Sequence, residues 1–362
     1  MKTIRNIFAV CDLEVEYAYH FMEYLNRKKT LPFEIRVFTS REKLCEFARD
    51  HRIELLLISD TAMCREVEEQ EIGQILILSG GVRDDKLKQY PSIYKYQSSA
   101  QVMREVMARY GEEHGTDPVP VQVVKKETEI IGIYSPVGRS MKTTFALTLG
   151  QILAKNKAVL YLNLEEYSGF EYLFEHVYEE TLSDLLYYLR QGNPNFIIKL
   201  NSMIRTISNL DYLPPASSPA DIQCTSYEEW VRLLQEIVDT SNYEAVILDI
   251  GDGVPRLFRL LDQCTRIYMP VRNDPMSQAK IQQFENLLRM SQGETVLEKI
   301  QKIRLPYHRT TRKGQGYLDD LVWSELGDYV RELLRKGAEM ITQEQEEKKK
   351  WGWSSLPKSA GS

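Results

Sequence analysis

Lys142, Thr143 and Thr144 are the residues whose types and order suggest chemistry most directly. They follow a short apolar run (129–135) and a loop that reads PVGRSM, and a helix-patterned segment follows them. The first N–H groups of a helix lack partners and attract anions, a lysine there can reach a phosphate, and a threonine hydroxyl can ligate Mg2+. The pattern therefore predicts a phosphate-binding loop. The residues expected to contact the ligand are Gly138, Arg139, Ser140, Lys142, Thr143 and Thr144.

The loop departs from the usual spacing of such motifs, G-x-x-x-x-G-K-[ST]. Pro136 and Met141 stand at the two glycine positions, where glycine would let the backbone approach a phosphate closely. Two interpretations therefore stay open. The loop binds phosphate despite these substitutions, or it is the helix start of an α/β protein that binds none.

Two carboxylates are expected at the same sheet edge as this loop. Asp249 lies near the end of the apolar run AVILDI, and Glu165 directly follows the run VLYLNL. Asp249 is expected to hold Mg2+ together with Thr143, because this ion prefers carboxylate and hydroxyl oxygens. Glu165 and Asp249 are also the candidates for a catalytic role. The alternative for Asp249 is a turn cap.

The elements that position these residues alternate along the chain. Residues 3–110 alternate strand-like and helix-like segments, and a second series of the same kind begins at Ile130. This alternation predicts parallel sheets with helical crossovers. We expect the α/β class, with two doubly wound parallel-sheet domains. The predicted boundaries are a first domain over 1–113, a linker over 114–129, a second domain over 130–338 and a charged, disordered tail over 339–362.

Composition excludes several classes of protein. The 362 residues are 43% hydrophobic and 27% charged, as is usual for a globular protein, and the net charge of -6 argues against a nucleic-acid partner. The five cysteines form no C-x-x-C pair, so neither a zinc site nor a disulfide framework is expected. No apolar run reaches the roughly 20 residues of a membrane span, and a cytoplasmic location is expected.

The loop and the strand-end carboxylates, in this order, resemble the ParA/MinD family of P-loop ATPases over most of residues 130–338. The family's loop reads K-G-G-x-G-K-T-T, and Lys142, Thr143 and Thr144 match its end. Asp249 matches the family's magnesium-strand aspartate. The resemblance implies ATP and Mg2+ as ligands and a homodimer as the functional form.

Several residues depart from the family pattern. Val137 stands where the family has the lysine that reaches the partner's nucleotide, and Arg139 and Met141 replace two glycines. Asn163 and Glu165 take the place of the family's D-x-D pair. Arg139 is the residue that would substitute for the missing lysine. These departures affect hydrolysis more than binding, so a weak ATPase and a nucleotide-independent pseudo-ATPase scaffold both stay open.

The N-terminal segment resembles a response-regulator receiver domain. Asp60 falls at the phosphoacceptor position after the third strand, and Asp12, Ser79 and Lys95 fall at other positions of that site. Cys11 replaces one member of the acidic pair, which weakens a magnesium site. The interval from Ser79 to Lys95 is too short for a full helix with its loops. Asp60 is therefore either the phosphoacceptor of an atypical receiver or a turn cap.

An atypical receiver followed by a ParA/MinD-type domain resembles the TadZ/CpaE proteins of pilus assembly. The resemblance implies a spatial organiser that localises a tight-adherence machine, with protein partners in a membrane-associated assembly and with recruitment to the inner face of the membrane or the cell pole. A signalling protein regulated at Asp60 is the alternative. The tail segment KKKWGW (348–353) suits a membrane interface, but the preceding EQEEKKK is charged all round and favours a solvated tail.

Overall fold

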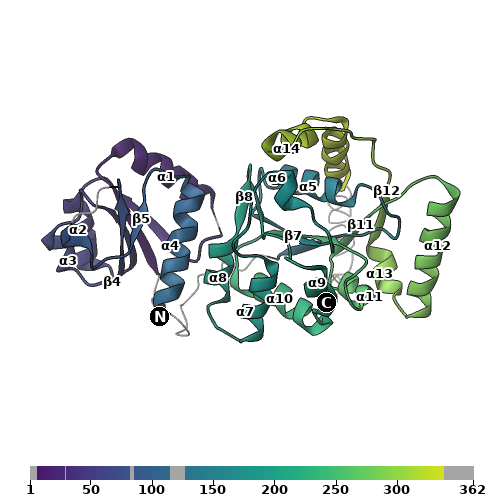
Figure 1. The fold of residues 1–362 in the computed structure, drawn as a ribbon, viewed down its shortest axis with the longest axis horizontal. Helices are drawn as coiled ribbons and strands as arrows, with labels where there is room; N and C mark the ends of the chain where they lie inside the picture. Colours follow the sequence, from purple (N-terminus) through teal and green to yellow (C-terminus); the bar gives the residue numbers. More distant parts are fainter. Residues whose placement is uncertain (1–5, 29, 82–84, 115–126, 338–362) are drawn as a thin grey trace, which may run out of the picture.

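The computed structural model describes residues 6–28, 30–81, 85–114 and 127–337. The described chain forms two separate sheets with helices packed around them (Figure 1). The α/β class with parallel sheets, expected from the alternating pattern, is confirmed. Most of the predicted linker and all of the predicted tail, including KKKWGW, lie outside the described residues, so the domain boundaries stay predictions.

The first sheet has five parallel strands in the order β2-β1-β3-β4-β5, which is the order of flavodoxin-like folds. Between β4 and β5 the described residues form only the short 3-10 helix η1 (Asp85–Leu87). The strands are β1 (Ile7–Cys11), β2 (Glu34–Phe38), β3 (Ile53–Ser59), β4 (Ile72–Ser79) and β5 (Ser92–Tyr94), and the helices are α1 (Val15–Arg27), α2 (Arg41–Asp50), α3 (Arg65–Glu68) and α4 (Ser99–His114).

The second sheet has seven strands in the order β12-β11-β6-β10-β7-β9-β8. The strands are β6 (Glu129–Ile133), β7 (Val159–Leu164), β8 (Arg205–Ile207), β9 (Leu210–Tyr212), β10 (Ala245–Ile250), β11 (Arg266–Pro270) and β12 (Ile300–Ile303). The helices are α5 (Lys142–Leu153), α6 (Phe170–Phe174), α7 (Leu182–Arg190), α8 (Phe196–Met203), α9 (Pro219–Cys224), α10 (Tyr227–Thr240), α11 (Leu257–Asp262), α12 (Pro275–Met290), α13 (Glu294–Lys299) and α14 (Gly314–Val322), and residues 325–337 are helical as well.

The central strand of the second sheet, β10, lies between β6 and β7 and is buried along its whole length. Strands buried on both faces read as continuous apolar runs, and AVILDI is such a run apart from its aspartate. The three strands are parallel, so their carboxyl ends lie side by side at one edge of the sheet. That edge is where the predicted loop, Asp249 and Glu165 meet.

One end of the second sheet has a feature that the sequence pattern did not predict. β8 pairs antiparallel with β9, with Arg205 opposite Tyr212. Only Ser208 and Asn209 separate the two strands, and Ser208 adopts a left-handed backbone with a φ of 55°. So short a connection joins antiparallel strands only, because parallel strands need a long crossover. β8 was missed because three residues are too few for a periodic pattern.

The two sheets are joined through α4 and α8, which pack together at the junction (Figure 1). A Cβ added at Gly111 of α4 would lie 3.2 Å from Cγ2 of Ile198 in α8, so the two helices approach closely there. One hydrophobic cluster contains Phe8 of the first sheet, Met107 of α4 and Ile198. Apolar packing therefore continues from the first sheet into the second.

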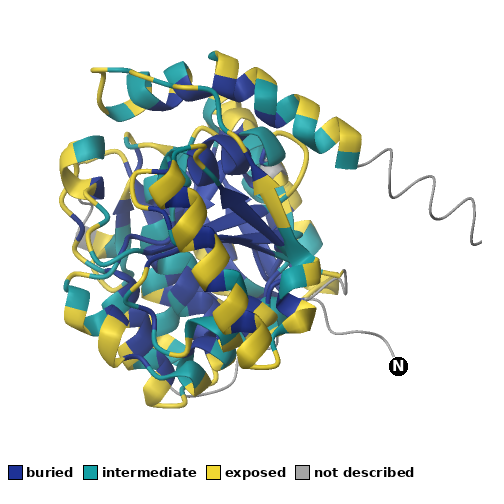
Figure 2. Ribbon diagram, turned by 90° about the vertical axis from the view of Figure 1, so that its right-hand side faces the viewer, coloured by how far each residue is buried: buried dark blue, intermediate teal, exposed yellow. Residues whose placement is uncertain are grey.

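Burial follows these layers (Figure 2). The strands are mostly buried, whereas the helices around them expose one side to solvent. Helix α10 buries Trp230, Leu233, Leu234 and Ile237, which stand at positions i, i+3, i+4 and i+7 and so share one face. In the part of the chain that the structure describes, no helix is long and apolar enough to cross a membrane.

Gly73 of β4 has no room for a side chain, because a Cβ there would lie 2.5 Å from the backbone carbonyl oxygen of Glu54 in β3. We expect Gly73→Ala to lower the free energy of unfolding by about 1–3 kcal/mol, as measured by urea denaturation. Gly138→Ala is the matched control, because a Cβ at Gly138 meets nothing within 4 Å. Equal stability of the two variants would contradict this expectation.

Candidate functional site

The loop between β6 and α5 has a backbone shape that glycine adopts readily. Arg139 and Met141 lie in the left-handed region, with φ of 55° and 64°, which costs a residue other than glycine roughly 1–2 kcal/mol. Ser135 fixes the start of the loop. Its hydroxyl donates to the carbonyl oxygen of Pro270 at 2.7 Å and accepts from the N–H of Val137 at 3.2 Å. The loop keeps this shape although two of the expected glycines are absent.

Lys142 is the first residue of α5, and its side chain reaches the carboxyl ends of β7 and β10. Its Nζ forms an ion pair with Glu165 Oε1 at 2.9 Å and donates to the carbonyl oxygen of Ile250 at 2.9 Å. The ammonium group also lies 5.4 Å from the ring centre of Tyr134. Only 12% of the lysine side chain is exposed. A phosphate that binds here must therefore compete with Glu165 for this cation.

Asp249 is fully buried near the end of β10. Its Oδ2 accepts hydrogen bonds from the Tyr161 hydroxyl at 2.9 Å and from Asn163 Nδ2 at 3.4 Å, whereas its Oδ1 has no hydrogen-bond partner among the described residues. Burial raises the pKa of this carboxyl to about 6, and the nearby Thr143 hydroxyl limits the rise. A buried carboxylate oxygen without a partner indicates the place of a ligand, a cation or water.

The groups at this edge suit Mg2+ bound together with phosphate. Thr143 and Asp249 offer a hydroxyl and a carboxylate oxygen, and Mg2+ commonly completes its shell with water and with phosphates of a second ligand. Within residues 6–28, 30–81, 85–114 and 127–337, no group of three or more His, Cys, Asp or Glu could hold a metal ion. Thr143 and Asp249 would leave the rest of a Mg2+ shell to water and to a second ligand.

The other residues of the predicted loop site differ in exposure. Gly138 and Arg139 are exposed. Ser140 is buried, and its Oγ has no hydrogen-bond partner among the described residues, so it is a second polar atom at the loop that a ligand would satisfy. Thr144 lies in the first turn of α5, with its Oγ1 3.4 Å from the hydroxyl of Tyr317. Tyr317 thereby places α14 beside the start of α5.

Two tyrosines at this site were missed by the sequence analysis. Tyr161 donates to Asp249 and lies 2.9 Å from Asn163 Nδ2, from which its oxygen accepts. Tyr134, directly after β6, donates to Asp252 Oδ1 at 3.1 Å. Tyr161 and Asn163 are two residues apart on one strand and therefore face the same side of the sheet. That spacing was the signal in the sequence that would have found Tyr161.

Gly251 and Gly253 were also missed, and both keep space for Glu166. A Cβ at Gly253 would lie 2.3 Å from Glu166 Oε1, and a Cβ at Gly251 would lie 2.8 Å from Glu166 Oε2. The Cβ at Gly251 would also come within 2.8 Å of the carbonyl oxygen of Leu164. The two glycines thus let the loop after β10 pack against the turn after β7, next to Glu165.

The candidate site of the first sheet forms at the carboxyl ends of β1 and β5. Lys95 Nζ lies 2.7 Å from Asp12 Oδ2 and 3.0 Å from Glu14 Oε1, and both Lys95 and Asp12 are buried. The lysine ammonium also lies 4.5 Å from the ring centre of Tyr17. Cys11 is fully buried, and burial, with the charge of Asp12, raises the pKa of its thiol to about 12. The thiol is therefore neutral and brings no charge to a metal.

Asp60 and Ser79 lie at the ends of the neighbouring strands β3 and β4. Asp60 Oδ1 accepts from the N–H of Thr61 at 2.7 Å, and its Oδ2 accepts from the N–H of Gly80 at 3.2 Å. Ser79 Oγ accepts from the N–H of Gly81 at 3.2 Å. Asp60 thus bonds the residue that follows it and also the loop after β4, so its side chain joins the ends of the two strands. The role of Asp60 as a phosphoacceptor, with Asp12, Ser79 and Lys95, stays a prediction.

No family model matches the sequence, and no curated protein matches it. Solved structures similar to part of the chain include a ParA family ATPase from Chlorobium tepidum TLS, with 16% identity, a TM-score of 0.42 and coverage of 54% of this chain and 90% of that chain. They also include cobyrinic acid a,c-diamide synthase from Mycobacterium smegmatis with bound ATP analog and magnesium, with 16% identity, a TM-score of 0.39 and coverage of 55% of this chain and 84% of that chain. A third is the MinC:MinD cell division protein complex of Aquifex aeolicus, with 18% identity, a TM-score of 0.38 and coverage of 50% of this chain and 69% of that chain. At these identities and TM-scores, the similarity assigns no function to this chain.

Asp249 is expected to make stability depend on pH. Its pKa rises from the ordinary 3.8 to about 6 in the folded chain, so its charge opposes folding, and stability falls as the pH rises through that window. With a chelator present, Asp249→Asn should raise the free energy of unfolding at pH 7.5 by up to about 3 kcal/mol, and the gain should vanish towards pH 4. Urea denaturation at several pH values measures this.

Glu171→Gln is the control for this prediction, because it removes an exposed carboxylate from α6. It should leave the pH dependence unchanged. If Asp249→Asn lowers the free energy of unfolding equally at pH 4 and pH 7.5, the charge of Asp249 does not oppose folding.

Proposed function

We propose that the chain binds ATP together with Mg2+ at the loop that precedes α5. The observation that carries this proposal is the convergence of Lys142 and Thr143 on Asp249, whose Oδ1 is buried without a hydrogen-bond partner among the described residues. A helix N-terminus, a lysine, a hydroxyl and a strand-end carboxylate are together the parts that hold a nucleoside triphosphate and its metal.

Each residue has a role that its position supports. Lys142 would neutralise the β- and γ-phosphates, and the N–H groups of residues 138–141 would donate to phosphate oxygens. Thr143 and Asp249 would hold Mg2+, which neutralises phosphate charge when it is bound. The hydroxyl of Ser140, buried without a hydrogen-bond partner in the described residues, is a further donor to a phosphate oxygen.

Glu165 is proposed to occupy Lys142 in the absence of nucleotide. Its carboxylate lies 2.9 Å from the ammonium, at the position that a phosphate must take over. A triphosphate carries more negative charge than one carboxylate and so favours the exchange. The exchange would release Glu165 beside the phosphates, where a carboxylate can accept a proton from water. Glu165 is thus both the competitor of the ligand and the candidate general base.

Hydrolysis is proposed to be weak. Val137, at the position where the family resemblance expects a lysine, is apolar and only 4% exposed. It offers no charge to a phosphoryl group during transfer. Arg139 is exposed on the same loop and is our candidate for the cation that reaches the nucleotide of a second copy of the chain.

We propose further that nucleotide binding serves spatial organisation in the cell. The support lies in the sequence, where a receiver-like segment precedes the ParA/MinD-type motifs in the order found in TadZ/CpaE proteins. In this role the chain would form a homodimer and recruit protein partners of a membrane-associated assembly. The proposed assembly is a pilus machine of the tight-adherence type, at the cytoplasmic face of the membrane or at the cell pole.

Lys142→Ala is expected to abolish binding of ATP with Mg2+, because it removes the cation at the phosphate position. Glu165→Gln is expected to tighten binding about threefold to tenfold, because it frees Lys142 and removes a negative charge near the phosphates. Titration calorimetry on the full chain measures both effects.

Lys155→Ala is the matched control for these variants. Lys155 follows the far end of α5, and its ammonium lies 5.3 Å from the ring centre of Trp323, so its removal should leave ATP binding unchanged. A wild-type protein that gives no heat of binding at millimolar ATP would overturn the proposal and leave the pseudo-ATPase scaffold.

Arg139 is expected to couple nucleotide binding to self-association. A ligand shifts a chain towards the dimer only if the dimer binds that ligand better. Sedimentation velocity on the full chain should show that ATP with Mg2+ raises the dimer fraction and that Arg139→Ala weakens the effect. Lys280→Ala, which removes an exposed cation of α12, should behave as wild type. A monomer under every condition would contradict nucleotide-driven association.

A further inference from the structure

Two aspartates of the second sheet are buried, and each accepts a hydrogen bond from the hydroxyl of a buried tyrosine. Asp211 of β9 is 5% exposed, and its Oδ2 accepts from Tyr243 at 3.0 Å. Asp249 of β10 is 0% exposed, and its Oδ2 accepts from Tyr161 at 2.9 Å. The two carboxylates differ at their other oxygen, Oδ1, so they can be compared within one protein.

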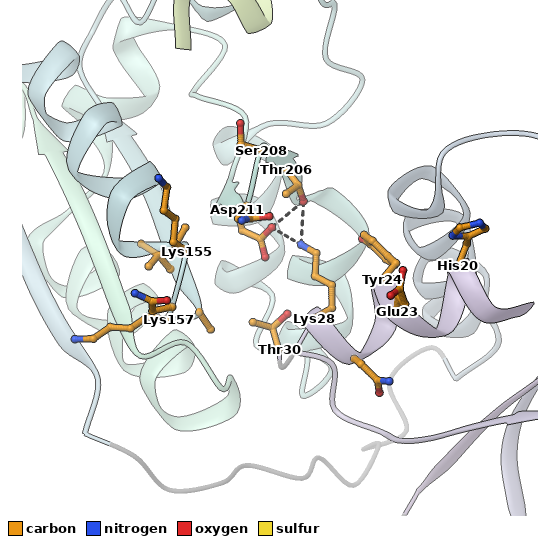
Figure 3. Close-up of a pocket in the computed structure, with 16 residues that line it drawn as sticks. His20, Glu23, Tyr24, Lys28, Thr30, Lys155, Lys157, Thr206, Ser208 and Asp211 are labelled. Carbon is orange, nitrogen blue, oxygen red and sulfur yellow. Dashed lines mark hydrogen bonds and ion pairs between the residues drawn. The ribbon is translucent and has the colours of Figure 1, made fainter. Parts of the chain in front are cut away.

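The carboxylate of Asp211 is fully satisfied by the chain itself. Its Oδ1 accepts from the Thr206 hydroxyl at 2.7 Å and forms an ion pair with Lys28, which directly follows α1 (Figure 3). The group borders a cavity of about 640 Å3 between α1 and the two strands β8 and β9. Because both oxygens have donors and a lysine matches the negative charge, this carboxylate needs no further cation to stay buried.

Asp249 lacks the second half of this arrangement. Among the described residues, its Oδ1 has no hydrogen-bond partner, and no lysine or arginine forms an ion pair with its carboxylate. The lysine at this edge of the sheet, Lys142, pairs with Glu165 instead. A buried carboxylate without a cation beside it is costly. The comparison with Asp211 therefore indicates that Asp249 receives its cation from outside the chain.

Tyr161 determines which oxygen of Asp249 is left for that cation. The tyrosine is fully buried in β7, and its ring stacks on Phe170 with 5.8 Å between the ring centres. Its hydroxyl oxygen accepts from Asn163 Nδ2 at 2.9 Å, so its single proton is directed to Asp249 Oδ2. This bond fixes the orientation of the carboxylate, with one oxygen held by β7 and the other without a partner among the described residues.

We propose that Tyr161 is a positioning residue for the metal ligand Asp249: its hydroxyl holds one carboxylate oxygen, so that the other is presented to Mg2+. The inference rests on the proposed binding of ATP with Mg2+, and it adds to that site a residue whose hydroxyl is already engaged by Asp249 and Asn163. Groups that orient a metal ligand in this way set the affinity of the metal.

The test compares the affinity of the full chain for ATP in Mg2+ and in EDTA by titration calorimetry. The ratio of the two dissociation constants measures how much the metal strengthens binding. General damage to the fold weakens binding in both solutions and so cancels in this ratio. Tyr161→Phe keeps the stacked ring and removes only the hydroxyl. We expect it to lower the ratio about tenfold, as the loss of a group that orients a metal ligand typically does.

Tyr243→Phe is the matched control, because it removes the corresponding hydroxyl from the satisfied carboxylate of Asp211. Thermal unfolding checks that both variants fold. The ratio for Tyr243→Phe should equal that of the wild type. If Tyr161 had a structural role alone, the two variants would give the same ratio.

Two further variants test whether Tyr161 acts through Asp249. Asp249→Asn should lower the ratio more than Tyr161→Phe does, and adding Tyr161→Phe to it should change the ratio no further. A further decrease would overturn the positioning role. Asn163→Ala serves as a second variant if Tyr161→Phe does not fold, because it removes the donor that orients the phenol. We expect it to lower the ratio about threefold, and an unchanged ratio would overturn the proposal.

The outcomes separate this inference from the proposed function. Absence of ATP binding in both solutions would overturn both. ATP binding that Mg2+ strengthens equally in the wild type, Tyr161→Phe and Tyr243→Phe would overturn only the role of Tyr161. A higher ratio in Tyr161→Phe would do the same, because it would show that the hydroxyl competes with the metal for the carboxylate.

Discussion

The buried carboxylate of Asp249 is the group on which the candidate site of the second sheet depends, although its charge opposes folding. A charge removed from water needs polar partners, and Tyr161 and Asn163 of the neighbouring strand β7 supply them to one carboxylate oxygen. The Thr143 hydroxyl of α5 also lowers the pKa of this carboxyl. The strand order that places β10 between β6 and β7 decides which side chains can do so. Lys142 adds a positive charge from the start of α5, which favours the ionised form. The strand order and the start of α5 thus place the groups that set the charge of Asp249.

The convergence of Lys142, Glu165 and Asp249 was predictable because it depends on strand ends and on one loop that leads into a helix. Glu165 and Asp249 lie at the ends of apolar runs, Lys142 follows the loop after a third run, and parallel strands bring their carboxyl ends to one edge. The sequence did not reveal that Glu165 holds Lys142, or that one oxygen of Asp249 lacks a partner. Those facts depend on rotamers and on distances across the sheet. At the first sheet, strand ends likewise predicted that Lys95 meets Asp12, while the second partner, Glu14, was missed.

The junction between the two sheets was not predictable. Lys28 directly follows an ordinary amphipathic helix and Asp211 lies on a strand of three residues, and neither belongs to a motif. The two sheets meet there through the packing of α4 against α8, which depends on small residues such as Gly111 and on the fit of individual apolar side chains. Periodic patterns identify which face of a helix is buried but not which other helix covers it.

Arg139 and Met141 share a left-handed backbone, but the two positions differ in how readily mutation can bring glycine to them. Glycine at either position would meet a main chain already in a conformation it prefers. Arginine codons become glycine codons by a change of a single base, whereas the methionine codon needs more than one. A single base change can thus place glycine at position 139, with loss of the exposed cation, whereas Met141 cannot become glycine in one step. If mutations accumulate in this loop, the change expected first is arginine to glycine at residue 139, which removes a positive charge and relieves the backbone strain there.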